Sequence, residues 1–110
     1  MELTETHQGR VLIIAPRGRI DSSTAPAFEK QLMERLAHHS FLVLDFSTVD
    51  FLSSAGLRLL ILAAKQINQD EGRLILCGVS QPIHDILEIS GFLGLIEVVD
   101  SRAQALAEIA

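Results

Sequence analysis

Hydrophobic residues in this chain occur in two patterns that alternate along its length. Short uninterrupted apolar runs bounded by turn residues are typical of buried β-strands, whereas apolar residues that recur every three or four positions are typical of helices. The first pattern predicts strands over residues 11–15, 41–46, 74–77 and 96–99. A less apolar strand is predicted over residues 3–7, where Gln8-Gly9 offers a turn. The second pattern predicts helices that begin at about residues 24, 54, 80 and 101.

The predicted order is β-β-α-β-α-β-α-β-α. Alternation of this kind calls for an α/β fold, with a mostly parallel (mixed) central sheet of about five strands and about four helices packed on it. No linker, internal repeat or low-complexity segment interrupts the 110 residues. We therefore expect residues 1–110 to form a single domain, which is long enough to bury one core.

The junction between the strand at 41–46 and the helix at 54 is the most informative segment. Its loop ends in two adjacent serines, Ser53 and Ser54, at the start of an apolar helix. Backbone N–H groups at a helix N-terminus point outward and favour an anion. Two interpretations remain open: a serine that only caps the helix, or a phosphate acceptor at Ser54 that acts as a covalent switch.

Composition narrows the classes of function. The chain is 48% hydrophobic and 21% charged, as expected of a folded globular protein, and its formal net charge is −5. The acidic balance and the absence of a Lys/Arg cluster disfavour a nucleic-acid partner. The N-terminus lacks the features of a secretory signal, and the apolar runs are far shorter than a membrane-spanning helix. We expect a cytoplasmic protein without direct membrane insertion, in which Cys77 is a small buried hydrophobe.

No catalytic or metal-binding constellation is visible. His38 and His39 are adjacent on a helix and point in different directions, and no Cys, Asp or Glu completes a ligand set. The chain has no glycine-rich phosphate loop, and Ser54 is not in a nucleophile-elbow context. A phospho-receiver domain is disfavoured because Asp45 lies inside a strand. We expect no catalytic residue, no metal and no cofactor.

Three blocks of sequence together carry a resemblance. Residues 44–57, LDFSTVDFLSSAGL, are similar to the pattern L-D-L-S-x-V-x-F-[MI]-D-S-[ST]-G-L of the STAS family, the domain of bacterial anti-sigma factor antagonists. Residues 18–21, GRID, with Thr24-Ala25 after them, resemble that family's G-x-L-D-x-x-T-A. Gly91-Phe92, Ile96 and Asp100-Ser101 before an alanine-rich helix resemble its usual end.

The resemblance implies a non-enzymatic regulator that works by partner switching in transcription. The unphosphorylated antagonist binds an anti-sigma factor that is itself a serine kinase, and thereby frees the sigma factor. Phosphorylation of the residue that matches Ser54 reverses the binding, and a PP2C-type phosphatase resets it. The resemblance also implies a partner-binding surface made of Asp21, Ser22, Ser53, Ser54, Gly56, Leu57 and Arg58.

Two positions depart from the family pattern beside Ser54. Ser53 replaces an acidic residue, and Arg58 replaces a small residue after the Gly-Leu pair. Phosphate on Ser54 would face the like charge of Asp21, and Arg58 would either offset that charge in part or remain a solvated helix residue. Both departures leave the identity of the kinase open.

An alternative class of function also fits the sequence. The chain resembles a STAS subunit that holds a constant partner, either in a stress-signalling scaffold or in a lipid-transporting ABC system. The broad apolar surface of the helix at 54–70 and the serine at position 53 keep this alternative open. The sequence also leaves the oligomeric state open.

Overall fold

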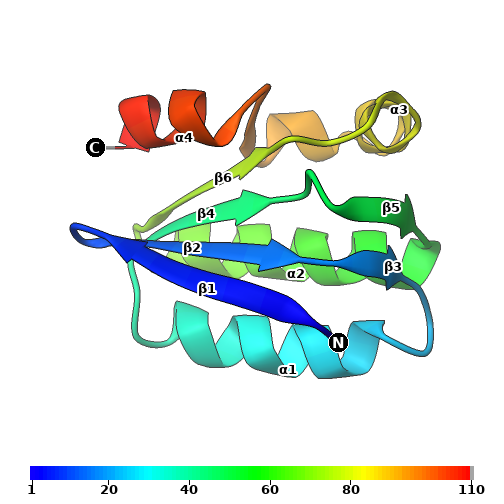
Figure 1. Cartoon of the computed structure of the whole chain (residues 1–110), viewed down its shortest axis with the longest axis horizontal. Coiled ribbons are helices and arrows are strands. Elements are labelled where there is room, and N and C mark those ends of the chain that lie inside the picture. Colours follow the sequence, from blue (N-terminus) through cyan, green and yellow to red (C-terminus); the bar gives the residue numbers. More distant parts are fainter. Residues whose placement is uncertain (110) are drawn as a thin grey trace.

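A five-stranded mixed sheet forms the centre of the computed structural model, which describes residues 1–109 (Figure 1). The strands of the whole fold are β1 (Leu3–Gln8), β2 (Val11–Pro16), β3 (Gly18–Ile20), β4 (Phe41–Asp45), β5 (Val49–Leu52), β6 (Arg73–Cys77) and β7 (Glu97–Val99). The helices are α1 (Ala25–Leu36), α2 (Ser54–Gln69), α3 (Gln81–Ile89), the 3₁₀ turn η1 (Phe92–Gly94) and α4 (Arg102–Ile109). None of these helices has the length and hydropathy needed to cross a membrane.

The strand order in the main sheet is β1-β2-β4-β6-β7. β1 and β2 form an antiparallel hairpin, and every other pair in this sheet is parallel. The predicted fold class is confirmed: the sheet is mixed and mostly parallel, with five strands, and four α-helices accompany it.

The two faces of the sheet are covered by different helices. α1 and α2 pack on one face, and α4 packs on the other (Figure 1). In β2, Leu12 and Ile14 join the core beneath α1 and α2, while Val11 and Ile13 join the smaller core beneath α4. A strand that is buried on both faces carries apolar residues at successive positions, which explains the uninterrupted runs in the sequence.

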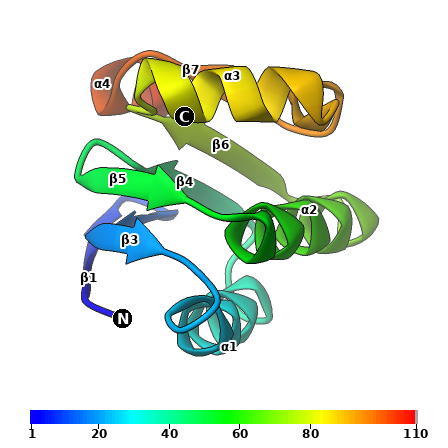
Figure 2. The same ribbon diagram turned by 90° about the vertical axis from the view of Figure 1, so that its right-hand side faces the viewer.

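A second sheet of two strands was not predicted. β3 and β5 pair in parallel, whereas the hydrophobic pattern predicts no strand at 18–20 and a loop before residue 54. That prediction was wrong because strands of three and four residues are too short to display a hydrophobic period. Their inward residues Ile20, Val49 and Leu52 are nevertheless buried. In the chain β3 follows β2, and β5 follows β4. Together the two short strands lie beside the start of α2 (Figure 2).

The last strand and last helix differ slightly from their predicted form. β7 begins at Glu97, because the amide of Ile96 bonds back to the Phe92 carbonyl of η1 at 3.4 Å and does not join the sheet. At α4 the Ser101 hydroxyl accepts the Gln104 amide hydrogen at 3.1 Å, as a capping box requires. The Gln104 side chain accepts from the amide of Asp100 at 3.3 Å, one residue earlier than in the usual motif.

Candidate functional site

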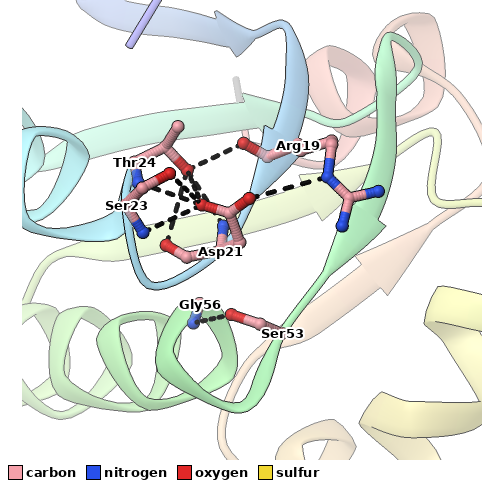
Figure 3. Close-up of polar contacts among 6 residues, drawn as sticks. All are labelled: Arg19, Asp21, Ser23, Thr24, Ser53 and Gly56. Atoms are coloured by element: carbon pink, nitrogen blue, oxygen red, sulfur yellow. Dashed lines mark hydrogen bonds and ion pairs between the residues drawn. The ribbon is translucent and has the colours of Figure 1, made fainter.

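Two segments distant in sequence meet at the N-terminus of α2. The amide of Ser53 donates to the carbonyl of Ile20 at 2.9 Å, which joins the start of α2 to the end of β3. Figure 3 shows the turn at Asp21 lying next to the first turn of α2. The fold therefore brings the two sequence blocks that carried most of the predicted site to one edge of the molecule.

The two serines at this junction have different tasks. Ser53 is the N-cap of α2: its backbone is extended, and its Oγ accepts the amide hydrogen of Gly56 at 3.2 Å (Figure 3). Ser54 is the first residue of the helix and is exposed. Within residues 1–109 no hydrogen-bond partner occupies its hydroxyl. The capping interpretation thus applies to Ser53, and it leaves Ser54 free to react with another molecule.

Gly56 allows α2 to approach the small sheet closely. A Cβ at this position would lie 2.6 Å from Leu52 Cδ1 and 2.7 Å from Ile20 Cγ2, closer than carbon atoms can pack. Gly56 is buried and Leu57 is half-buried. Of the seven residues predicted to face a partner, Gly56 is therefore the one that is buried, whereas the other six reach the surface at least in part.

The carboxylate of Asp21 organises the turn that faces α2. Its Oδ1 accepts the amide hydrogen of Ser23 at 2.9 Å, the Ser23 hydroxyl at 2.6 Å and the amide hydrogen of Thr24 at 3.1 Å (Figure 3). The hydrogen bonds from Ser23 are the main reason that the pKa of Asp21 falls from 3.8 to about 2. The site therefore carries a fixed negative charge at neutral pH.

Thr24 is the N-cap residue of α1, but its side chain does not cap the helix. Its hydroxyl donates instead to the carbonyl of Arg19 at 2.8 Å, and it accepts the amide hydrogen of Asp21 at 2.9 Å. These bonds hold the end of β3 against the start of α1. They stiffen the turn that presents Asp21 and the exposed Ser22.

Two arginines lie near the junction and differ in how they are held. Arg19 has its Nε 3.5 Å from Asp21 Oδ2, and its guanidinium stacks on the Phe51 ring with 4.1 Å between the guanidinium carbon and the ring centroid. Arg58 is exposed and makes no ion pair with any residue in 1–109. Phe51, at 38% exposure, was missed by sequence reasoning, because its outward direction depends on the unpredicted pairing of β3 with β5.

A shallow groove of about 250 Å³ separates the first turns of α1 and α2. Ser22 and Glu29 line it from the α1 side, and Ala55 and Arg58 line it from the α2 side. The groove places Ser22 and Arg58 on one continuous surface beside Ser54. This surface is accessible to a docking protein.

A second polar cluster lies at the end of β4. Asp45, only 6% exposed, accepts from Arg102 Nε at 2.8 Å and from the Ser47 amide at 2.9 Å. Burial alone would raise the pKa of Asp45, but the hydrogen bonds from Ser47 and Arg102 outweigh it and lower the pKa. Cys77 is buried as predicted, and burial together with the Asp45 charge raises the pKa of its thiol to about 11. No local pattern indicated that Arg102 would pair with Asp45.

The junction exposes the Ser54 hydroxyl on the first turn of a helix. Within the described chain no base hydrogen-bonds this hydroxyl. An exposed hydroxyl on the first turn of a helix is nevertheless a good acceptor for a group transferred by another enzyme, because the local backbone favours an anion.

Comparisons with known proteins agree on one family. The family model described as the STAS domain matches residues 3–105. BtrV, a candidate anti-sigma factor antagonist of Bordetella bronchiseptica, is 37% identical over 108 residues, which cover 97% of this chain and 93% of BtrV. The anti-sigma F factor antagonist of Paenibacillus polymyxa is 31% identical and covers 96% of this chain and 91% of its own. A crystal structure of a candidate anti-sigma factor antagonist from Thermotoga maritima has a TM-score of 0.92, with 18% identity and coverage of 97% and 93%.

Proposed function

Because the chain belongs to the STAS domain family, we propose that it is an anti-sigma factor antagonist whose partner binding is switched off by phosphorylation of Ser54. The observation that carries this proposal is that the two serines differ in their contacts. Ser53 caps α2, while the hydroxyl of Ser54 is exposed beside the fixed charge of Asp21. Modification of Ser54 therefore changes the surface without removing a bond that the fold needs.

The proposed partner is an anti-sigma factor that is also a serine kinase. The name of the Paenibacillus polymyxa relative supports an anti-sigma factor as the binding target. The kinase activity of that target, and a PP2C-type phosphatase that reverses the modification, follow from the family resemblance. In this scheme the unphosphorylated protein sequesters the anti-sigma factor in the cytoplasm and frees the sigma factor. The protein itself catalyses no reaction.

The covalent step uses ATP held by the partner. The Ser54 oxygen attacks the γ-phosphorus of ATP, an oxygen–phosphorus bond forms, and the bond to the ADP leaving group breaks. A base on the kinase takes the hydroxyl proton. The product carries about −1.5 to −2 charges at neutral pH, where the helix N-terminus tolerates them. A partner surface that fits the neutral hydroxyl next to Asp21 would then meet two anions, so we expect the complex to dissociate.

The alternative, a STAS subunit with a constant partner, is not favoured. BtrV and the Paenibacillus polymyxa protein, which match nearly the whole chain at more than 30% identity, both carry names of the antagonist class. A constant interface would also give the exposed, unbonded hydroxyl of Ser54 no role. Equal recovery of a partner by the unmodified and phosphorylated proteins would restore the alternative.

The first experiment locates the phosphate. The purified protein is incubated with its cognate anti-sigma factor and ATP, and intact mass and peptide mapping identify the modified residue. We expect one phosphate on Ser54, which Ser54→Ala abolishes. Ser53→Ala is the matched control, since it removes the neighbouring hydroxyl and leaves the acceptor in place. Incorporation at Ser53 or Ser22, or none at all, would contradict the proposal.

A further inference from the structure

Arg58 is the cation near Ser54 that the unmodified protein leaves without a partner. Arg19 already pairs with Asp21 and stacks on Phe51. Arg58 is exposed, and no carboxylate of residues 1–109 lies within ion-pair distance of it. Glu29 lines the opposite wall of the groove, and it too makes no ion pair within residues 1–109. The Arg58 guanidinium is therefore available for a new anion.

The spacing on α2 brings Arg58 next to Ser54. Both residues lie in the helix and are separated by four positions, so they are neighbours on one face with about 5 to 6 Å between their Cβ atoms. An acidic group four residues before a basic one is also the favoured order of such a pair. The arginine side chain is long enough to reach a phosphate on Ser54 and can donate two hydrogen bonds to its oxygens.

We propose that Arg58 binds the phosphate of Ser54 within the same molecule and so holds the phosphorylated, dissociated state. The inference rests on the proposed function, because it concerns the product of that modification. A bond to Arg58 neutralises part of the added charge and offsets the repulsion from Asp21. It also satisfies the phosphate without a cation from the partner, which favours release of the phosphorylated protein from the kinase. Arg58 is a positioning residue for the phosphate and has no part in the transfer.

The test uses the full chain with phosphoserine incorporated at position 54 during translation, so that it does not depend on a kinase. Phosphorus NMR follows the second ionisation of the phosphoserine against pH. Arg58→Ala should raise the pKa of that phosphate by about 0.15 to 0.4 unit, the size expected of an exposed pair one helical turn apart. Arg58→Lys should keep most of the effect, and 1 M salt should remove the difference between the native residue and alanine.

The matched control is Lys65→Ala. Lys65 lies on the same helix and is exposed, and its loss changes the net charge equally, but it lies 11 residues from Ser54, or about 16 Å along the axis. Equal shifts for Arg58→Ala and Lys65→Ala, or no shift for either, would overturn the inference. A merely structural role of Arg58 in the helix would move the melting temperature and leave the phosphate pKa unchanged. Failure of the kinase to modify Ser54 would instead count against the proposed function.

Discussion

Asp21 and Asp45 each begin a turn of the same kind, but Asp45 is buried and Asp21 lies at the surface. Each follows or ends a strand, and each accepts the amide hydrogen of a serine two residues later at 2.9 Å. Asp45 is buried and paired with Arg102, which comes from the far end of the chain. Asp21 remains partly exposed, and its partners are its own neighbours and an exposed arginine.

This difference separates a carboxylate that is buried in a long-range ion pair from one that remains at the surface. The Asp45–Arg102 pair joins β4 to the start of α4, so loss of the arginine would leave a nearly buried charge without its partner. The bonds around Asp21 are local and fix only the shape of one turn. Its charge remains available to another protein. A turn motif alone therefore does not reveal its role, which depends on the long-range contacts around it.

The largest expected effect on stability is that of Arg102→Ala. It removes the partner of a carboxylate that is almost fully buried. We expect a loss of about 2 to 3 kcal/mol of unfolding free energy, less than for a fully buried pair because Arg102 itself is partly exposed. Urea unfolding monitored by circular dichroism measures the change. Binding to the anti-sigma factor should be retained below the transition. A loss under 0.5 kcal/mol would show that the comparison between the two turns is mistaken.

Arg19→Ala is the corresponding change at the other turn. Arg19 pairs with Asp21 at the surface, where such an ion pair contributes about 0 to 1 kcal/mol. We expect the urea midpoint to change little. Because the same substitution frees the Phe51 ring and leaves the Asp21 charge unbalanced, partner affinity measured by calorimetry should fall more than stability does. The reverse order of the two effects would place Arg19 among the structural residues.

A smaller difference in unfolding free energy is expected between the alanine variants of Ser53 and Ser54. Ser53→Ala removes the N-cap of α2 and should lower the unfolding free energy by about 1 kcal/mol. Ser54→Ala removes a hydroxyl without an internal partner and should change it by less than about 0.5 kcal/mol. Thermal and urea unfolding of the two variants, side by side, measure both values. Equal losses would mean that Ser54 contributes to the cap.

The smallest effect concerns acid pH. The pKa of Asp21 is about 2 in the folded protein and 3.8 ordinarily, so the folded state holds its carboxylate more strongly than the unfolded chain does. The resulting stabilisation is complete above about pH 4 and is lost as the pH falls toward 2. Urea midpoints from pH 5 to 2 should decline less steeply in Asp21→Asn than in the native protein. Parallel declines would argue against a lowered pKa.

Much of this arrangement could be predicted from the sequence. Uninterrupted apolar runs indicated strands with both faces covered, and the recurring apolar positions indicated the helices between them. The resemblance carried by residues 18–25, 44–57 and 91–101 is confirmed by the family match over residues 3–105. It pointed to Ser54 before any contact was known, and the role of Ser54 stays a prediction.

The remainder depends on contacts between distant segments. The pairing of β3 with β5 determines that Phe51 points outward, and strands so short leave no period in the sequence. The Asp45–Arg102 bond joins residues 57 positions apart. The choice between Ser53 and Ser54 as cap depends on where the first turn of α2 begins. The local pattern of apolar and polar residues does not indicate these contacts.

The most direct test compares the affinity of the anti-sigma factor for the unmodified protein and for the protein with phosphoserine at position 54. We predict that calorimetry will show a loss of about 100-fold or more on phosphorylation, equivalent to about 2.7 kcal/mol. Circular dichroism spectra and melting temperatures of the two forms should agree within about 2 °C. Equal affinities of two folded proteins would contradict the account.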